Sequence, residues 1–517
     1  MSLSNFSFLL PHNPAVTTDD PLGFSDADEY PIPAYPIIKS HLLEKFQSFP
    51  PESSPEAIVS AFISAISDLS YTLHNRPDPN LNLLKSCLLS HPNPITPIQC
   101  ILDAASTLPA QLPSGTLLSL QPGEIRTYTT EQITALAAHQ FVLTLSSPPW
   151  NDWGGVNLDS WFSDADGIVE PKQAYIRIAL DFFTNRATHG NIPQDDLHNL
   201  SFHLCCTHSP SPLTATAPLV HLSVIELPQE ADFPAIPTPE NSSETRTTYI
   251  ISSHRLIGHG PSGTQEERLL ASIPELLPVS TFTPPLEGTT ALAVSAAPAN
   301  ASFTPTAAFT GHGRTARIDS SYNRSDYTRV ATVAQQEEQT SVHDRDEKRI
   351  IRANAFLFLN ATELDAFDDV PAGVLPDFLP DMLEKDLLKA YVGFHGVFSS
   401  QAEVTKHRII APPWGCGAFG GDVRVKLLLL WIAASFAAAD AQNQQNSVME
   451  VELVFLVKQF ILDLKEEGWR ECIEKIEGSG VTADRVWKAL VDAREKKSTN
   501  VFESIFHALG LPKPVSL

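Results

Sequence analysis

The sequence predicts a layered α/β fold preceded by a mostly α-helical region. The first 200 residues carry apolar residues at helical spacing, and prolines separate the helical stretches. After about residue 205, short β-type runs alternate with helical patterns, an order typical of α/β domains. We therefore divide the chain into a helical domain at residues 1–204 and an α/β domain at residues 205–517.

In the N-terminal region the helical periodicity is clearest at residues 55–73, 129–145 and 172–183. Thr130 and Gln132, with acidic residues nearby, favour a helix start at the second of these stretches. Trp150, Trp153 and Trp161 lie in a segment rich in Asp and Gly, and we interpret them as packing anchors and not as a binding cage.

The C-terminal region contains six apolar runs that predict strands and four patterns that predict helices. The strands are expected at residues 219–225, 247–251, 291–296, 354–359, 409–411 and 450–456. The helices are expected at residues 265–271, 375–392, 423–439 and 457–476. Residues 298–310 and 320–347 are polar or rich in Ala, Thr and Pro, and they predict loops.

The composition excludes several classes of function. The 517 residues include 60 acidic and 35 basic ones, so the net charge of −25 disfavours direct binding to nucleic acids or anionic membranes. The cysteines have no C-x-x-C spacing, which favours a reducing compartment over disulfides or a zinc site. No cluster of His, Cys and Asp suggests a metal, and we expect no cofactor. The six cysteines are Cys87, Cys100, Cys205, Cys206, Cys416 and Cys472.

The N-terminus lacks the basic residues and the long apolar run of a signal peptide. The most apolar stretch, residues 427–439, has 13 residues, which is too short to span a bilayer and predicts a buried core helix. We expect a soluble protein of the nucleus or the cytoplasm, with no membrane contact.

The most informative motif is residues 414–422, with the sequence WGCGAFGGD. Four glycines in seven positions let the backbone approach a ligand closely, because no Cβ stands in the way. A short buried strand is expected before the motif, and Asp422 is a good N-cap for the helix that follows. A glycine loop at a helix N-terminus binds anionic oxygens, so a phosphate or diphosphate ligand is predicted.

The same loop, read as Gly415-x-Gly417-x-x-Gly420, also fits the dinucleotide fingerprint of a Rossmann fold. That fold requires an acid about 20 residues further on, at the end of a second strand. Asp440 has this spacing but lies in what looks like a helix end, and only 95 residues follow Asp422. We therefore disfavour a nicotinamide-dependent oxidoreductase, and a tight turn without a ligand is disfavoured further.

A second glycine loop, residues 258–264 (GHGPSGT), follows another predicted strand and leads directly into Gln265-Glu266-Glu267. Two adjacent acids at a helix start can simply be solvated and favour the helix dipole. A second Gln-Glu-Glu, at residues 336–338, lies in a polar stretch without a glycine turn, and we assign no role to it.

Together the two loops resemble the poly(ADP-ribose) glycohydrolase family, whose active site is a macrodomain. The family's C-terminal motif is similar to residues 414–422 at all nine positions, and residues 388–394 look like another of its segments. Residues 130–133 and 158–204 look like its helical accessory domain, so the resemblance covers roughly residues 125–480. It implies a macrodomain-like mixed sheet sandwiched between helices.

The resemblance implies a set of site residues. Glu267 matches the catalytic glutamate, and Glu266 matches the neighbour that helps to hold the ribose. The expected substrate-binding residues are Gly258, His259, Gly260, Gln265, Phe309, Gly311, Trp414, Gly415, Cys416, Gly417, Ala418, Phe419 and Gly420. Among them, the loop from Gly415 matches the diphosphate site, and the ring of Phe309 matches one that packs near the adenine.

This chain departs from the family pattern at four positions. Ile251 and His254 replace an Asp and an Asn that bind the ligand, His259 interrupts a run of three glycines, and Pro413 replaces an Asn. The adenine contacts and the geometry around the distal ribose are open for that reason.

The implied activity is hydrolysis of ribose–ribose O-glycosidic bonds in poly(ADP-ribose), which releases ADP-ribose. Such a reaction passes through an oxocarbenium-like state and requires a carboxylic acid to protonate the departing oxygen. Glu267, partly buried beside Glu266, is expected to have the raised pKa that this role needs. The alternative is a catalytically weak macrodomain that binds ADP-ribose as a reader. In either case we expect a monomer whose partner is ADP-ribose or its polymer.

Overall fold

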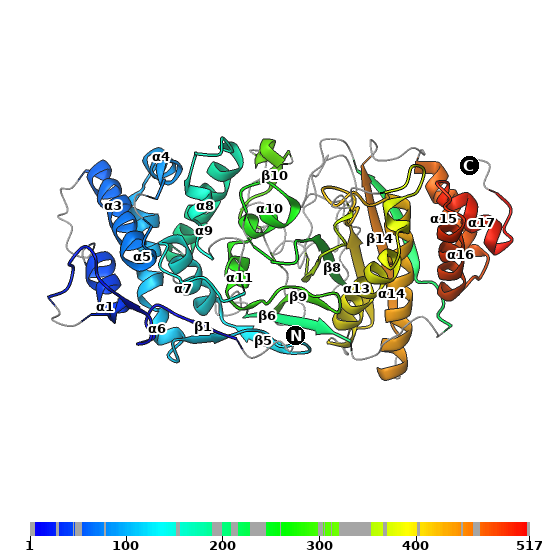
Figure 1. Cartoon of the computed structure of the whole chain (residues 1–517), viewed down its shortest axis with the longest axis horizontal. Helices are drawn as coiled ribbons and strands as arrows, with labels where there is room; N and C mark the ends of the chain where they lie inside the picture. Colours follow the sequence, from blue (N-terminus) through cyan, green and yellow to red (C-terminus); the bar gives the residue numbers. More distant parts are fainter. Residues whose placement is uncertain are drawn as a thin grey trace, which may run out of the picture.

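The computed structural model describes most of the chain. The described residues are 6–26, 30–44, 46, 54–76, 79–150, 156–188, 199–207, 216–227, 245–258, 260–297, 303, 305–311, 313–319, 353–364, 370–400, 404–445, 448–458 and 466–513. Figure 1 shows N-terminal helices at one end, a sheet in the middle and C-terminal helices at the other end.

An eight-stranded mixed sheet forms the centre of the molecule. Its strand order is β5-β6-β9-β12-β8-β13-β14-β7. The strands from β12 to β7 are parallel to one another, whereas β5, β6, β9 and β12 pair antiparallel. The bounds are β5 Ile125–Tyr128, β6 Asn199–Cys206, β7 His221–Leu227, β8 Thr245–Ser252, β9 Thr290–Ala297, β12 Ala355–Leu359, β13 Lys406–Ala411 and β14 Glu450–Lys458.

Each face of the sheet is covered by helices, which confirms the predicted α/β class. Because side chains alternate along a strand, Ile251 of β8 points into the core shared with the N-terminal helices, while its neighbour Ile250 points into the other core. That second core contains α13 (Met382–Ser399) and α14 (Val423–Gln445). The predicted core helix at residues 427–439 forms the middle of α14 and is buried almost throughout.

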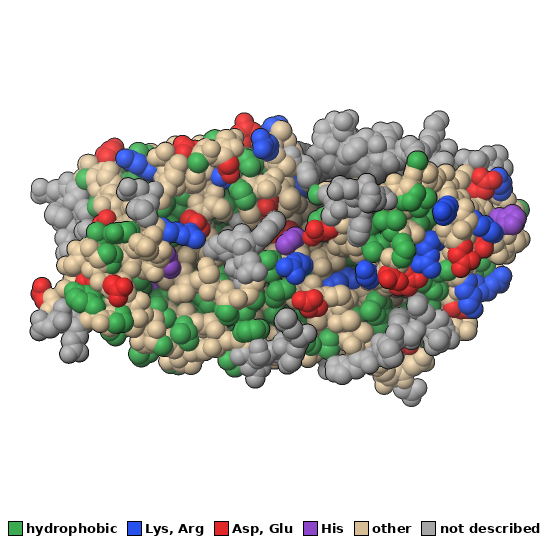
Figure 2. Space-filling view, in the orientation of Figure 1, with side chains coloured by type: hydrophobic (Ala, Val, Ile, Leu, Met, Phe, Trp, Pro, Cys, Tyr) green, Lys and Arg blue, Asp and Glu red, His purple; other side chains and the backbone are tan. Residues whose placement is uncertain are grey.

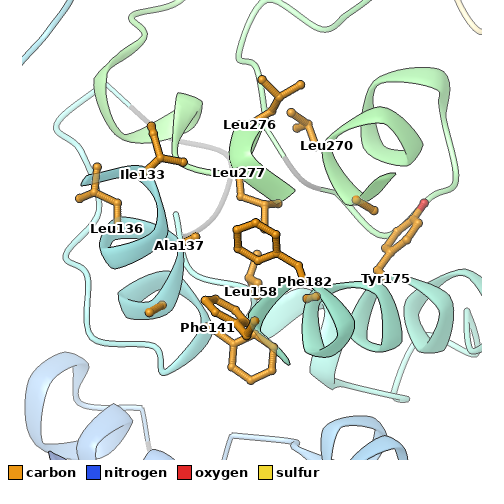
Figure 3. Close-up of a cluster of buried hydrophobic side chains, with 14 of the residues drawn as sticks. Ile133, Leu136, Ala137, Phe141, Leu158, Tyr175, Phe182, Leu270, Leu276 and Leu277 are labelled. Carbon is orange, nitrogen blue, oxygen red and sulfur yellow. The ribbon is translucent and has the colours of Figure 1, made fainter. Parts of the chain in front are cut away.

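The N-terminal region is helical, as predicted, and its larger helices are α3 Pro55–His74, α4 Asn82–Ser90, α5 Ile95–Ser106, α7 Thr130–Phe141 and α9 Glu170–Thr188. Figure 3 shows how α7 and α9 meet the segment after the glycine loop at residues 258–264: Phe141, Phe182 and Leu277 belong to one buried cluster, with Ile133 and Leu270 nearby. One hydrophobic core therefore joins this region to the sheet.

The remaining elements are short or C-terminal. They are α1 Ala34–Ile38, η1 Lys39–Glu44, α6 Leu108–Gln111, α8 Asp159–Phe162, α10 Gln265–Ser272, η4 Pro274–Leu276, α11 Val279–Phe282, η5 Gly313–Thr315, η7 Pro376–Phe378, α15 Glu466–Gly478, α16 Ala483–Glu495 and α17 Val501–Leu509. Three two-stranded sheets pair β1 Ser7–Leu9 with β4 Thr116–Leu118, β2 Thr17–Thr18 with β3 Ile32–Pro33, and β10 Phe309–Thr310 with β11 Arg317–Ile318.

Within the described ranges, one helix has the length and apolar composition that a membrane span needs, namely α3. Core helices of soluble proteins meet the same criterion. In this structure Val59, Phe62, Ile66 and Leu69 of α3 are fully buried in the helical core. Packing inside the protein thus accounts for the apolar face of α3.

Two predicted helices have different bounds in the structure. The helix expected at residues 375–392 begins only at Met382, because Pro376 and Pro380 confine the preceding chain to a short 3-10 turn. Of the helix expected at residues 457–476, Val457 and Lys458 belong to β14, residues 459–465 lie outside the described residues, and α15 spans Glu466–Gly478. The predicted loop at residues 320–347 lies outside the described residues.

The division of the chain at residue 204 stays a prediction. Strands β5 and β6 come from the segment that was expected to be helical, and they join the same sheet as the later strands. The sheet therefore begins well before the proposed boundary.

Candidate active site

The two glycine loops meet at one edge of the sheet. The first loop, residues 258–264, follows β8, and the second loop, residues 414–422, follows β13. Because β8 and β13 are parallel neighbours in register, both loops leave the sheet at the same end. The segment after β12 joins them there. The carbonyl of Leu359 accepts hydrogen bonds from Ser253 N at 3.0 Å and from Trp414 Nε1 at 3.0 Å. Pairing between strands thus brings together motifs that are about 150 residues apart in the sequence.

The first loop leads into α10, which begins with a capping box. The Thr264 hydroxyl accepts from the Glu267 N–H at 3.4 Å, and the Glu267 carboxylate accepts from the Thr264 N–H at 2.9 Å. Gln265 points back to β8, where its Oε1 accepts from Ser252 N at 3.1 Å. These bonds fix the direction of the first turn and bury both glutamates of the motif.

Glu266 organises the chain that precedes the loop. It is 5% exposed, and its two carboxyl oxygens accept from His254 N and Gly258 N, each at 2.8 Å. Burial raises the pKa of Glu266 to about 8, although the two backbone hydrogen bonds act in the opposite direction, and the nearby Glu267 raises it further. Charge on this carboxyl is therefore disfavoured near neutral pH.

Glu267 lies under the glycine loop. The side chain is 8% exposed, and a Cβ built on Gly260 would overlap its Oε1, so only glycine allows this close approach. Burial raises the pKa of Glu267, while hydrogen bonds from Thr264 and from the backbone of Gly263 and Ser262 lower it. The net result is a carboxyl that retains its proton to higher pH than an exposed glutamate.

A third segment is docked on this loop. Gly313 N donates to Gly263 O at 3.0 Å, and Arg268 Nη1 donates to Gly311 O at 2.8 Å. Gly263 has a φ of +73°, and a Cβ there would overlap the Gly313 carbonyl. Phe309 is buried, and the edge of its ring meets Tyr175 with centroids 5.5 Å apart. The structure thus brings Phe309 and Gly311 to the site.

The second loop presents unused backbone donors. Gly415 and Gly420 adopt φ of +72° and +71°, and Gly421 N donates to Gly415 O at 2.9 Å, which closes the turn. Within the part of the chain that the structure describes, the N–H groups of Gly417 and Ala418 donate no hydrogen bond to the protein, and both residues are exposed. Such N–H groups, in a glycine loop that leads into a helix, can bind an anion.

Phe419 and Cys416 complete this loop. Phe419 is half-buried, and its carbonyl accepts from Leu364 N at 2.9 Å. Cys416 N donates to Pro413 O at 3.1 Å, and burial raises the pKa of the Cys416 thiol well above its ordinary value. Trp414 is fully buried under the loop.

A buried ionic cluster supports the loop from below. Lys426 of α14 lies 2.9 Å from Asp377 and is also paired with Asp386. Asp377 in turn accepts from Asp422 N at 2.7 Å. Burial alone would lower the pKa of Lys426, but Asp386 and Asp377 raise it to about 12. The ammonium group is therefore fully committed to its own carboxylates, which leaves the backbone N–H groups of the loop to hold an anionic ligand.

The departures from the family pattern fall in different places. Ile251 is fully buried in the core and offers no hydrogen bond to a ligand. His254 is half-buried, and its Nε2 lies 3.6 Å from Glu363 Oε1. Pro413 belongs to the second loop, where its carbonyl accepts from Cys416. His259 lies outside the described residues.

Several residues that support the site were not predicted. Lys426, Asp377 and Asp386 come from three separate elements, and nothing in their spacing indicates that they would meet. Trp161 and Tyr175 come from the helical region and pack at the first loop. Among the described residues, no group of three or more His, Cys, Asp or Glu side chains could hold a metal ion.

A mixed sheet between helices, with an anion-binding glycine loop and two buried carboxyl groups at the ends of adjacent parallel strands, defines a macro domain with a candidate hydrolytic site. Residues 240–443 match the family model described as poly(ADP-ribose) glycohydrolase (PARG), macro domain fold. The chain therefore carries a PARG catalytic domain, which confirms the predicted family and fold. A domain of this kind implies glycohydrolysis of poly(ADP-ribose).

Proposed function

We propose that this protein releases ADP-ribose from poly(ADP-ribose), with Glu267 as the general acid and the loop around Gly417 as the diphosphate cradle. The observation that carries the proposal is the position of Glu267. One oxygen is held by Thr264 N, and the other lies under Gly260, at the edge of the sheet where both glycine loops meet. A carboxyl held in this way can present a proton in a fixed direction.

Glu267 suits this role better than Glu266. Both oxygens of Glu266 already accept backbone hydrogen bonds, from His254 and Gly258, so this residue shapes the loop. In Glu267, Oε2 accepts from Thr264 N, and Oε1 lies against Gly260 under the first loop, where we propose that it carries the transferable proton. The burial that raises the pKa of Glu267 also favours its protonated form near neutral pH.

The reaction follows from these positions. Glu267 donates its proton to the oxygen that links the two riboses while the bond from this oxygen to the anomeric carbon breaks. Water then adds to the anomeric carbon and gives a proton to the Glu267 carboxylate, which restores the acid. The diphosphate of the substrate, bound to the N–H groups of Gly417 and Ala418, would stabilise positive charge on the ribose ring.

Local N–H groups are the expected anchor for the polymer, because the protein as a whole is strongly acidic. The net charge is −25, and Figure 2 shows acidic and basic side chains interspersed over the face that it presents. We therefore do not expect the polymer to be attracted by a broad basic surface of the protein.

The test is Glu267→Gln. The chain itself shows that glutamine preserves this cap, since Gln132 occupies the same position in the capping box of α7 and accepts from Thr129 N at 3.0 Å. We expect release of ADP-ribose from the polymer to fall by about 10² to 10⁴, the usual contribution of a general acid. ADP-ribose binding, measured by calorimetry, should be largely retained.

The matched control is Glu503→Gln. Glu503 also stands three residues after a helix N-cap, Asn500, and hydrogen bonds with it, but it lies in α17, outside residues 240–443. This variant should keep full activity. Near-normal turnover by Glu267→Gln would remove Glu267 from the mechanism.

The second candidate function is an ADP-ribose reader, and one observation favours it. Ile251 is buried and apolar where the resemblance expects a ligand-binding acid, and this substitution would weaken recognition of the adenine. The wild-type protein separates the two candidates. Binding of ADP-ribose without release of ADP-ribose from the polymer would support the reader.

The oligomeric state and the cellular compartment are further parts of the proposal. We propose that it acts as a monomer in the nucleus or the cytoplasm. Its six cysteines all lie in described residues and none of them forms a disulfide, which supports a reducing compartment. Light scattering and microscopy of the tagged full chain would test both statements.

A further inference from the structure

Trp161 reaches the first glycine loop from the helical region. It lies in α8, outside residues 240–443, and is fully buried. Its indole N–H donates to the carbonyl of Gly260 at 3.3 Å. A second contact fixes the ring of Trp161, because it packs against the ring of Tyr175 of α9 with centroids 4.9 Å apart.

Gly260 is the residue that covers the candidate acid. Because a Cβ on Gly260 would overlap Oε1 of Glu267, the backbone at this position lies directly against the carboxyl. The hydrogen bond from Trp161 therefore ends on the backbone unit that shields Glu267 from water.

Tyr175 extends the same support. Its ring meets Phe309 with centroids 5.5 Å apart, so Trp161, Tyr175 and Phe309 form a continuous aromatic contact. Figure 3 shows Tyr175 standing on α9 beside α10. Its hydroxyl is buried beside Gly263 of the first loop. These rings are rigid and leave the loop little room to move away from Glu267.

We propose that Trp161 is a positioning residue for the glycosidic reaction, which holds Gly260 over Glu267 and thereby keeps the acid shielded from water. This inference rests on the proposed function. It assigns a catalytic task to a helical region that lies outside the matched family domain.

A looser loop over Glu267 should change the pH dependence of catalysis. The titratable groups that interact with Glu267 are Glu266 of α10 and Tyr175 of α9, and Arg268 of α10 interacts with Tyr175 in turn. If the loop loosens, water reaches Glu267 and its pKa falls towards the ordinary value. The active, protonated form is then lost at lower pH, so the alkaline limb of the kcat profile shifts to lower pH.

The test is Trp161→Phe, which keeps an aromatic ring and removes the N–H donor. We expect kcat to fall about 10- to 100-fold, as for a small misplacement of a catalytic group, with KM much less affected. The alkaline limb should shift to lower pH. Trp161→His, which retains a ring N–H, should recover part of kcat.

Trp431→Phe is the matched control. Trp431 is equally buried, and its indole N–H donates to the Val220 carbonyl at 2.8 Å, in α14. This variant loses the same kind of hydrogen bond away from Glu267. It should leave kcat and the pH profile unchanged even if its thermal stability falls.

Hydrogen–deuterium exchange gives a readout that does not depend on activity. In Trp161→Phe the amides of residues 260–268 should exchange faster, while in Trp431→Phe they should not. If the wild type proves inactive but exchange still accelerates in Trp161→Phe, the proposed function fails, whereas the role of Trp161 in holding Gly260 over Glu267 stands. Unchanged exchange and an unchanged pH limb in folded Trp161→Phe would overturn the inference. So would failure of Trp161→Phe alone to fold, because Trp161 would then support the whole fold and not the loop.

Discussion

Replacing Lys426 with methionine should destabilise the protein more than any other single lysine change that the structure suggests. The side chain is fully buried between Asp377 and Asp386. Methionine has a similar length but leaves two carboxylates buried without a cation. Removing one partner of a buried ion pair costs about 3–5 kcal/mol, because the remaining charge is no longer compensated.

The hydrogen bonds that remain do not replace the lysine. Asp386 still accepts from Thr362 N at 2.9 Å, and Asp377 still accepts from Asp422 N at 2.7 Å. Burial already raises the pKa of Asp377, and without Lys426 that pKa rises further. The destabilisation should therefore be largest near pH 7 and should shrink as the pH falls and the carboxyls become protonated.

The same change should weaken ligand binding. The Lys426 side chain lies beneath the second loop, where its Cε would be 3.3 Å from a Cβ on Gly415. Urea unfolding followed by circular dichroism measures the stability, and calorimetry measures the affinity for ADP-ribose. We expect both to decrease in Lys426→Met.

Lys172→Met is the control for this prediction. Lys172 is equally buried, but its carboxylate partner Asp166 is 43% exposed at the side chain, so water can solvate the acid that remains. The loss of stability should be smaller, about 1 kcal/mol, and ADP-ribose affinity should be unchanged. Equal effects of the two substitutions on stability and on binding would refute the assignment of Lys426 to the loop.

Two further predictions concern the second loop and the response to acid. Gly420→Val should abolish ADP-ribose binding by calorimetry, because valine does not tolerate a φ of +71°, whereas Gly480→Val, at a φ of +67° in the turn before α16, should bind normally. Burial lowers the pKa of His139 to about 4, although the hydrogen bond to the Ala105 carbonyl acts in the opposite direction. Between pH 6.5 and pH 4 the unfolded chain therefore binds a proton at His139 that the folded chain does not bind. This residue should lower the free energy of unfolding by about 3 kcal/mol as the pH drops from 6.5 to 4. Urea unfolding at several pH values tests this, and an equal pH dependence of the unfolding free energy in His139→Gln and the wild type would contradict it.

The strands of the α/β region could be predicted because their signals are local. All six predicted runs form strands of the central sheet, since each is apolar and bounded by polar or glycine-rich residues. Strand β6 was not predicted, although Leu200, Phe202 and Leu204 alternate towards one core. The alternation lies within the region that was predicted to be helical, and pairing with β5 and β9, which are distant in sequence, makes it a strand.

At the candidate site, the glycine-loop motifs could be predicted from the sequence, but the residues that hold these loops in place could not. Glycine loops can be recognised in a sequence because few other residues permit those backbone conformations. Trp161 is 99 residues from Gly260, and a tryptophan that donates to a distant carbonyl looks like any other packing residue in the sequence. Asp377 and Asp386 likewise look like surface acids until Lys426 is placed between them.

The pairing of β7 with β14 also constrains how the chain can fold. β7 is the last strand of the sheet, and its neighbour β14 is made more than 200 residues later. During synthesis β7 must therefore wait, with both edges unpaired, until almost the whole sheet-forming sequence has emerged from the ribosome. Long-range pairing of this kind slows folding and exposes strands that can aggregate. Production of this protein should consequently depend more on chaperones and on slow translation than its well-filled cores alone would suggest.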